Sequence, residues 1–492
     1  MIAAHFPALQ IVIPLIAAPL CILLRWRDAP FGIALVATWS AFIISSALLG
    51  QVMDQGVIVY EMGGWAAPWG IEYRIDAANA MVLLIVSGIG SVVVPYTRNS
   101  MLLEYIHDRH YMFYSAYLLC LTGLMGVAIT GDAFNLFVFL EISSLSSYVL
   151  ISLGFDRRAL TAAYQYLVLG TIGATFIVIG IGLLYHATGT LNMMDMSQKL
   201  AANGYNRTVV AAFAFITVGT MLKLALFPLH LWLPDAYTYA PSSVSAFLAA
   251  TATKVAVYVL LRFFFTIFGA EFSFETLPSG PPLMALAIIA MFTGSFVAIF
   301  QENVKRMLAY SSVAQIGYMI LGVSLVTIDG LTATVLHLFN HALIKGSLFL
   351  VMGCIYYRIA SVHIDDFAGL GRRLPLTMAA FVIGGLSLIG VPLTAGFISK
   401  WQLVLAALDR DLWWVAALIM ASSLLAVVYV WRVVEIAYFR PQPPGKEAVT
   451  DAPVSLLIPT WVLIILNIYF GIHAELPMTV ARMAAHALLG AP

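Results

Sequence analysis

Residues 219–246 read GTMLKLALFPLHLWLPDAYTYAPSSVSA, so Lys223 stands inside a long apolar run that Pro228 and Pro234 then interrupt. Proline lacks a backbone N–H donor and clashes with the preceding helical turn. Inside a membrane, a broken helix is tolerated only where protein buries it or where it lines a wet cavity. A lysine beside such a break is typical of a transport site. The stretch therefore predicts a helical membrane bundle with Lys223 in its interior.

The composition of the whole chain supports a membrane protein. Of the 492 residues 62% are hydrophobic and 10% are charged, and the mean hydropathy is +0.96. Soluble domains carry about a quarter charged residues. The 24 Lys and Arg balance the 24 Asp and Glu, which leaves no electrostatic footprint for nucleic acid. We expect an integral membrane protein that does not bind nucleic acid.

Apolar runs long enough to cross a bilayer recur along the chain. A hydrocarbon core of roughly 30 Å requires about 20 apolar residues per helix. The sequence predicts an all-α polytopic membrane protein with about fourteen spans. Their approximate limits are 8–24, 31–50, 77–97, 111–130, 133–154, 161–186, 208–230, 242–267, 282–300, 311–328, 331–357, 375–408, 412–438 and 454–473.

The distribution of positive charge predicts the orientation. Fourteen Lys and Arg fall in connections after odd-numbered spans, and six fall in connections after even-numbered spans or in the C-terminal tail. Positive charge marks the cytoplasmic side. We therefore expect a multi-pass protein of a prokaryotic-type cell inner (plasma) membrane, with both termini on the outer or periplasmic side.

Residues 57–76 alternate apolar and polar side chains around Gly63-Gly64 and a Pro68-Trp69-Gly70 turn. This pattern predicts a small outer β-hairpin.

The second interrupted span predicts an internal repeat. In the segment 384–408, GGLSLIGVPLTAGFISKWQLVLAAL, Pro392 interrupts the predicted helix and Lys400 follows the interruption. The seventh span has the same two features, a proline at 228 and a lysine at 223. Two broken helices five spans apart indicate repeats over spans 4–8 and 9–13, and five is odd, so the repeats are inverted. The predicted divisions are 1–110 with the hairpin at 57–76, 111–267 and 282–438 for the repeats, and 454–492 for the last helix and tail.

Five charged residues are predicted in the middle of spans. Burying one charged side chain at mid-bilayer costs about 2.5–3.5 kcal/mol on insertion scales, so we expect each to have a function. The acid is Glu141, and the serines that follow it could satisfy its carboxylate in a purely structural role. Pairing of Glu141 with a buried lysine is the favoured interpretation. The lysines are Lys223, Lys254, Lys345 and Lys400.

His337, His341 and Lys345 are spaced i, i+4 and i+8 and share one helix face. Histidine titrates near neutral pH and passes protons, so the stripe favours a proton relay over simple helix-to-helix hydrogen bonding. Metal binding is disfavoured because the H-E-x-x-H pattern is absent and Lys345 adds positive charge. Lys254 would link the two broken helices.

Pro228, His230, Asp235 and Pro392 are expected to act as gate or structural residues at the broken helices. The sequence has no Gly-rich phosphate loop, no G-x-S-x-G motif and no C-x-x-C spacing among its three cysteines. It therefore predicts no catalytic residues, no metal and no cofactor of its own, only the movement of charge.

Five motifs resemble the antiporter-like subunits shared by respiratory complex I, membrane-bound hydrogenases and multisubunit Mrp-type Na+/H+ antiporters. Together they extend across nearly the whole chain. They are FVFLEISSLSSYVL (137–150), LKLALFPLHLWLPDAYTYAPSSVSA (222–246), TATKVAVYVL (251–260), VLHLFNHALIKGSLFLVMG (335–353) and GVPLTAGFISKW (390–401). Within the family, LFPLHLWLPDAYTYAP and Lys400 look most similar to the D subunit of an Mrp antiporter.

The resemblance implies a pathway in which Glu141 pairs with Lys223, Lys254 connects across, His337 or His341 continues, and Lys400 ends the path. It implies a component of a Na+ (or K+ or Li+)/H+ antiporter driven by the proton motive force, with other hydrophobic subunits and a larger antiporter-like homologue as partners. A proton-pumping component of a redox-driven complex is the first alternative. A structural scaffold is the second.

Overall fold

Helices make up nearly all of the computed structural model, which describes residues 2–26, 28–105, 110–441 and 449–490. Arg27, Arg109 and Lys446, which contribute to the predicted cytoplasmic charge, lie outside these ranges. The first helices are α1 (Phe6–Leu23), α2 (Ala29–Gln55), α3 (Ala77–Glu104), α4 (His110–Ile129), α5 (Ala133–Ser152), α6 (Arg157–Thr188), α7 (Met193–Asn203), α8 (Arg207–Leu224), α9 (Trp232–Tyr239) and α10 (Ser242–Leu261).

The second half continues the bundle after two π-helical turns, η3 (Arg262–Ile267) and η4 (Glu271–Thr276). Its helices are α11 (Gly280–Ile299), α12 (Val304–Ser324), α13 (Ile328–Ile359), α14 (Leu370–Arg373), α15 (Pro375–Ile389), α16 (Ala395–Leu408), α17 (Trp413–Phe439), α18 (Val454–Ile472) and α19 (Glu475–Leu489). Short 3-10 turns are η1 (Ile2–His5), η2 (Met62–Gly64) and η5 (Ile364–Phe367).

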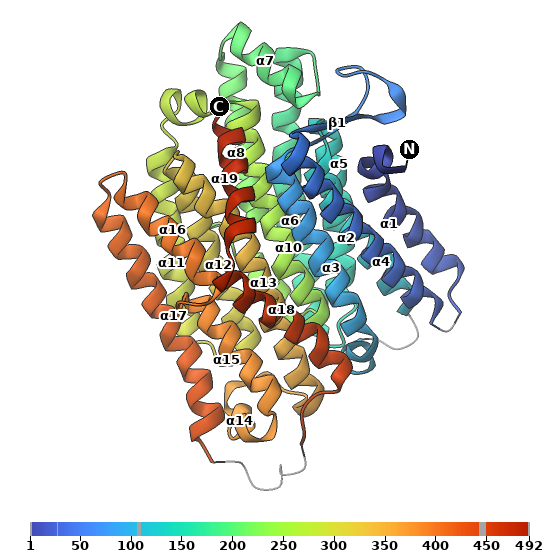
Figure 1. Ribbon diagram of the computed structural model, residues 1–492, viewed down its shortest axis with the longest axis vertical. Coiled ribbons are helices and arrows are strands. Elements are labelled where there is room, and N and C mark those ends of the chain that lie inside the picture. The colour runs from blue at the N-terminus through green and yellow to red at the C-terminus, as the bar shows by residue number, and fades with distance from the viewer. Residues whose placement is uncertain (1, 27, 106–109, 442–448, 491–492) are drawn as a thin grey trace.

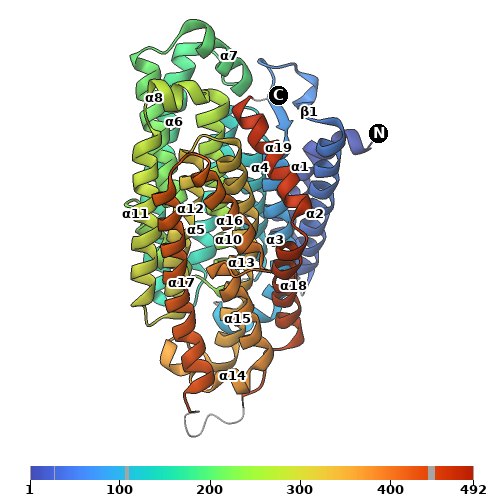
Figure 2. The same ribbon diagram turned by 60° about the vertical axis from the view of Figure 1, so that its left-hand side comes forward.

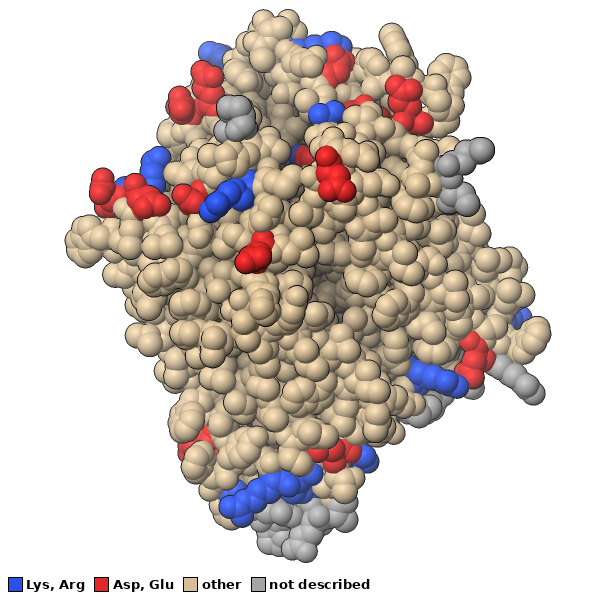
Figure 3. Space-filling view, in the orientation of Figure 1, with Lys and Arg blue, Asp and Glu red and all other residues tan. Residues whose placement is uncertain are grey.

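The predicted all-helical membrane fold is confirmed. Thirteen helices among the described residues are long and apolar enough to cross a membrane, and α15 and α16 share the remaining predicted span. Burial is greatest in α10, α12 and α13, which form the centre, whereas α1, α6, α11 and α17 lie at the periphery. In Figure 3, charged side chains gather towards the two ends of the face shown, with a broad belt nearly free of charge between them.

The predicted β-hairpin is also confirmed. Strand β1 (Ile58–Glu61) pairs antiparallel with β2 (Glu72–Ile75), and Tyr60 lies opposite Tyr73. Figures 1 and 2 show the hairpin and both termini at one end of the bundle and α14 at the other. We refer to these as the hairpin end and the α14 end.

Several helices in this bundle begin where a short polar side chain caps free N–H groups. Asp132 accepts from the backbone of Asn135 at the start of α5, and Asn303 accepts from that of Arg306 at the start of α12. Capping matters here because the first N–H groups of a helix have no partner within the helix. These caps determine where α5 and α12 begin.

Three helix pairs meet at interruptions instead of at ordinary loops. The chain stops being helical between α8 and α9, between α15 and α16, and between α18 and α19. The first two interruptions were predicted from Pro228 and Pro392. The third was not, because residues after 473 were expected to be a tail.

The last two helices together cross the bundle once. At the start of α18, Asp451 accepts hydrogen bonds from Thr377 at the start of α15, and Gly471 at its other end packs on Leu393 and Thr394 in the α15–α16 interruption. Helix α19 then packs on α13 and α3 and finishes at the hairpin end. The interruption after α18 therefore lies beside the one after α15.

The start of α3, directly after the hairpin, is fastened to η3 by a buried ion pair. Arg262 Nη2 lies 2.6 Å from Asp76 Oδ1, and Asp76 also accepts from the backbone N–H groups of Ala78 and Asn79. Burial raises the pKa of the Asp76 carboxyl, but Arg262 and the two N–H groups outweigh that effect and hold the pKa below its ordinary value. A carboxyl whose pKa is lowered by folding stabilises the fold above its ordinary pKa.

We expect Asp76→Asn to lower the melting temperature of the detergent-solubilised protein at pH 7, since breaking a buried ion pair costs about 3–5 kcal/mol. The difference from wild type should begin to shrink below about pH 4, where Asp76 of the unfolded wild type gains a proton, and should be lost as the pH falls through the lower pKa of Asp76 in the folded protein. Asp28→Asn, which breaks the exposed pair with Arg98, is the matched control and should have little effect. A pH-independent difference would contradict this role of the ion pair.

The packing of α6 against α8 can be tested at two glycines of α6. A Cβ at Gly180 would press on Ile216 and lie 3.0 Å from the carbonyl oxygen of Ala212, whereas one at Gly182 would meet nothing within 4 Å. Gly180→Leu should destabilise the protein by about 1–3 kcal/mol through overpacking. Gly182→Leu should leave the melting temperature in detergent unchanged or higher. Equal losses in both variants would show that α6 and α8 do not pack in this way.

Candidate functional site

Lys223 is the best-defined member of the predicted pathway. It lies in the last turn of α8, and its Nζ donates to Ser144 Oγ at 2.8 Å and to Glu141 Oε1 at 3.5 Å. Glu141 and Ser144 are on adjacent turns of α5. The structure thus brings together the predicted pair, with a serine as the nearer partner of the lysine.

The two members of this pair differ in exposure. The side chain of Lys223 is 6% exposed, whereas that of Glu141 is 23% exposed. Glu141 stands in the middle of a span, so a charged side chain partly reaches the apolar surface of the isolated chain. A cavity of about 30 Å³ beside Lys223 is lined by α5 serines and by Ala252 and Val255 of α10. This volume is enough for a water molecule.

At the break after Lys223 the carbonyl of Leu222 loses its regular helical partner and accepts from the backbone N–H of Ala225 at 3.2 Å and from a side chain. Trp232 Nε1, at the start of α9, donates to the carbonyl of Leu222 at 2.9 Å. The predicted gate residue Pro228 lies in the connection, where buried His230 stacks on Phe227. Asp235 instead pairs with Arg306 at 3.2 Å. Its contact fastens α9 to α12.

Lys254 and Lys345 are fully buried and have only neutral hydrogen-bond partners. Lys254 Nζ donates to the carbonyl of Ala249 and lies 3.4 Å from Thr253 Oγ1. Lys345 Nζ donates to the carbonyl of Leu308 at 2.7 Å and to Ser311 Oγ at 2.5 Å. Both lysines lie close enough to act electrostatically on His341.

The two histidines of α13 have different surroundings. Their rings stack with centroids 5.7 Å apart. His337 bridges two other helices, with Nδ1 2.8 Å from Ser399 Oγ and Nε2 2.9 Å from Gln315 Oε1. His341 is fully buried, and neither ring nitrogen has a hydrogen-bond partner among the described residues. His341 is therefore free to accept a bond from a mobile group or water.

Lys400 lies at the second helix break. Its Nζ donates to the carbonyls of Leu388 and Ile389 at 2.9 Å each and to Ser423 Oγ at 3.1 Å, and it faces the ring of Tyr318. The two carbonyls are those freed where α15 ends. Pro392 lies in the interruption that creates them. Lys400 thus does at this break what Trp232 does at the first.

Of the predicted series, only Glu141 and Lys223 are joined by a hydrogen bond, and the rings of His337 and His341 stack. Among the described residues, Lys254, Lys345 and Lys400 have no hydrogen bond to another member of the series. No direct hydrogen bond joins Lys223 to Lys254 in the part of the chain that the structure describes, and the small cavity lies on that side. Sequence reasoning missed the neutral partners. Gln315, the lone amide in an apolar helix, was the detectable signal; the role of Ser311 and Ser399 needed the packing of α12, α13 and α16.

Residues 130–426 match the family described as "NADH:quinone oxidoreductase/Mrp antiporter, TM". The chain belongs to this family. Among its described residues, no group of three or more His, Cys, Asp or Glu is placed to hold a metal ion. The family match agrees with the predicted antiporter-like protein, and the chain is a multi-pass membrane protein of the kind found in multisubunit complexes.

Relatives of this antiporter-like chain occur in different complexes. The chain is 40% identical to the N subunit of the NADH-quinone oxidoreductase of Desulforudis audaxviator, over 96% of each protein. It is 31% identical to the D subunit of the Na(+)/H(+) antiporter of Alkalihalophilus pseudofirmus, over 95% of this chain and 94% of that one. A chain of the membrane-bound sulfane sulfur reductase, an archaeal respiratory membrane complex, superimposes with a TM-score of 0.90 at 31% identity, over 98% and 97% of the two chains.

The different surroundings of the two histidines give a prediction. His337→Leu removes two interhelical hydrogen bonds and leaves Gln315 with a buried, unpaired oxygen, which costs about 1–3 kcal/mol. His341→Leu removes no described hydrogen bond. We expect the melting temperature in detergent to fall in the first variant and to change little in the second. The reverse order would contradict these contacts.

Proposed function

We propose that this chain carries protons across the membrane as one component of a larger complex, along the series Glu141, Lys223, Lys254, Lys345, His341, His337 and Lys400. The observation that carries the proposal is that two buried lysines, Lys223 and Lys400, stand at helix breaks inside the bundle. Ionisable groups at such positions are costly and mark ion pathways.

The Glu141–Lys223 contact is the proposed switch. Burial disfavours a charged lysine and a nearby carboxylate favours it. At 3.5 Å the pair is loose, and Ser144 offers Lys223 an alternative partner at 2.8 Å. When Glu141 moves away, Lys223 gives its proton to water in the adjacent cavity. The proton then passes to Lys254, the α13 stripe and finally Lys400.

A neighbouring subunit is proposed to cover Glu141. A carboxylate that is 23% exposed in the middle of a span would otherwise face lipid, which is unfavourable. A partner with a basic or hydrogen-bonding side chain at this depth would satisfy it and would also control how tightly Glu141 holds Lys223. The proposed partners are hydrophobic subunits of the same complex, including a larger antiporter-like homologue.

The complex we favour is a monovalent cation/proton antiporter of the Mrp type, driven by the proton motive force. This assignment is supported by Lys400 and by the likeness to an antiporter D subunit. Glu141 is the only carboxylate predicted at mid-span, so this chain would carry protons while a partner handles Na+, K+ or Li+. We also propose that the α14 end faces the cytoplasm. Spans 4–8 and 9–13 are proposed to form two inverted five-helix repeats.

A redox-driven complex is the second candidate, favoured by the 40% identity to an NADH-quinone oxidoreductase subunit. The same pathway would then respond to electron transfer in partner subunits. Purification of the native complex through a tag on this chain, with mass spectrometry of its companions, separates the two. A second antiporter-like chain with small hydrophobic subunits supports the antiporter; flavin or iron–sulfur companions support the redox complex.

The pathway predicts that Lys223→Ala lowers the rate of ΔpH-driven cation exchange by roughly tenfold or more, as expected for the loss of a proton carrier. If the co-purified subunits show that the complex is redox-driven, the same loss is expected in redox-driven proton transport. The rate would be measured in everted vesicles that contain the whole complex. Lys199→Ala, which removes an exposed lysine paired with Asp195, is the matched control and should keep the wild-type rate.

Complex yield must be measured in the same membranes. Normal assembly with lost transport excludes a purely structural scaffold, whereas lost assembly would support it. A Lys223→Ala complex that assembles and transports at the wild-type rate would refute the proposed pathway.

A further inference from the structure

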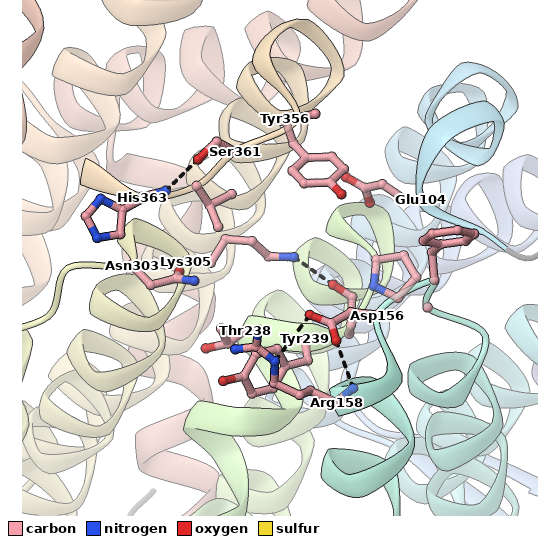
Figure 4. A pocket seen from close by; sticks show the side chains of 16 residues that line it. Glu104, Asp156, Arg158, Thr238, Tyr239, Asn303, Lys305, Tyr356, Ser361 and His363 are labelled. Carbon is pink, nitrogen blue, oxygen red and sulfur yellow. Dashed lines mark hydrogen bonds and ion pairs between the residues drawn. The ribbon is translucent and has the colours of Figure 1, made fainter. Parts of the chain in front are cut away.

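A cavity of about 330 Å³ lies at the α14 end and takes no part in the series from Glu141 to Lys400. Its walls come from the end of α3, the α5–α6 and α9–α10 connections, the start of α12 and the end of α13. It therefore lies where the predicted repeats meet. Figure 4 shows Lys305 reaching into it from the α12 side, with Glu104 on another wall.

Two buried charges stand at the depth of this cavity. Glu104 is 8% exposed and Lys305 is 5% exposed. Glu104 accepts hydrogen bonds from the backbone N–H and, at 2.7 Å, from the hydroxyl of Ser242, the first residue of α10. Lys305 Nζ donates to the carbonyl of Ala240 at 2.6 Å. The two charges influence each other, but no direct ion pair joins these described side chains.

Polar and ionisable groups are distributed from the rim of the cavity to its walls around Glu104. The rim carries exposed polar groups, among them the ion pair Asp156–Arg158 and the ring of His363. Further ionisable side chains on the walls or beside Glu104 are Lys305, Tyr239, Tyr356, Tyr96 and Tyr105. Burial raises the pKa of the Glu104 carboxyl above its ordinary value, although Lys305 and Ser242 oppose this.

Helix α12 runs from the cavity to the hydrogen-bond partners of Lys345 in the buried pathway. Lys305 lines the cavity, and Ser311, six residues further along the same helix, accepts the hydrogen bond of Lys345. Six residues of α-helix rise roughly 9 Å. Leu308, between them, offers its carbonyl to Lys345 as well. A short water-filled step would join the cavity to the pathway.

We propose that this cavity is the inlet through which protons reach the pathway from the α14 side, with Glu104 as the group that takes them up. The inference rests on the proposed proton transport. A hydronium ion in the cavity gives its proton to a carboxylate oxygen of Glu104 and becomes water. The carboxyl then releases that proton to a water molecule on the pathway side and becomes a carboxylate again. Between cycles, the positive charge of Lys305 stabilises the carboxylate form of Glu104.

Substitution of Glu104 tests the inlet in everted vesicles that contain the whole complex. Glu104→Gln keeps an oxygen that accepts from Ser242 but binds no proton, so transport should fall roughly tenfold and lose its dependence on the pH of the α14 side. Glu104→Asp should retain a pH-dependent rate. Glu72→Gln, a buried carboxylate at the hairpin end, is the matched control and should behave as wild type. An assembled Glu104→Gln complex with the wild-type rate and pH profile overturns the proposal.

A cysteine on the cavity wall gives a second test that does not depend on Glu104 variants assembling. Val362 lines the cavity and is partly exposed, whereas Cys21, Cys120 and Cys354 are buried. Val362→Cys should react with a membrane-impermeant, cationic thiol reagent from one side of the membrane only, and labelling should reduce transport severalfold. Labelling with no loss of rate, or no labelling from either side, overturns the inlet. Wild-type vesicles without any transport would instead count against the proposed function.

Discussion

Main-chain carbonyls that lose their partners where α8 and α15 stop are the constraint on which this bundle depends. Within a membrane no bulk water is available to them, so side chains donate in addition to any backbone N–H that remains, such as that of Ala225 to the carbonyl of Leu222. Trp232 bonds to the carbonyl of Leu222, and Lys400 bonds to those of Leu388 and Ile389. A side chain is thus held at each break by the need to satisfy the backbone.

The two breaks use different donors, and this difference separates structural from functional roles. An indole N–H keeps its proton, so Trp232 only stabilises the first break and leaves Lys223 to interact with Glu141 and Ser144. At the second break the stabilising donor is itself an ammonium group. Any loss of the proton from Lys400 changes the hydrogen bonding of the α15 end, which couples charge to backbone conformation there.

Composition and spacing were sufficient to predict the membrane fold, the hairpin, two helix breaks and the pairing of Glu141 with a buried lysine, because unfavourable charges in apolar runs are visible in sequence. The resemblance to antiporter-like subunits was needed to identify that lysine as Lys223. The partners of these charges were not predictable, since Ser311, Gln315 and Ser399 approach α13 from other helices. Glu104 and Lys305 were missed because both lie near span ends, where charges are ordinary. Helix α19 was not predicted, because the span before it is already long enough to cross the bilayer by itself.

The neighbouring interruptions after α15 and α18 have a mechanical consequence. An unbroken helix resists bending because bending strains its ladder of main-chain hydrogen bonds. Where Gly471 packs on Leu393 and Thr394, two adjacent helices lack that ladder at the same level. The bundle therefore resists bending less there than along its unbroken helices, and this shared weak level lies close to Lys400.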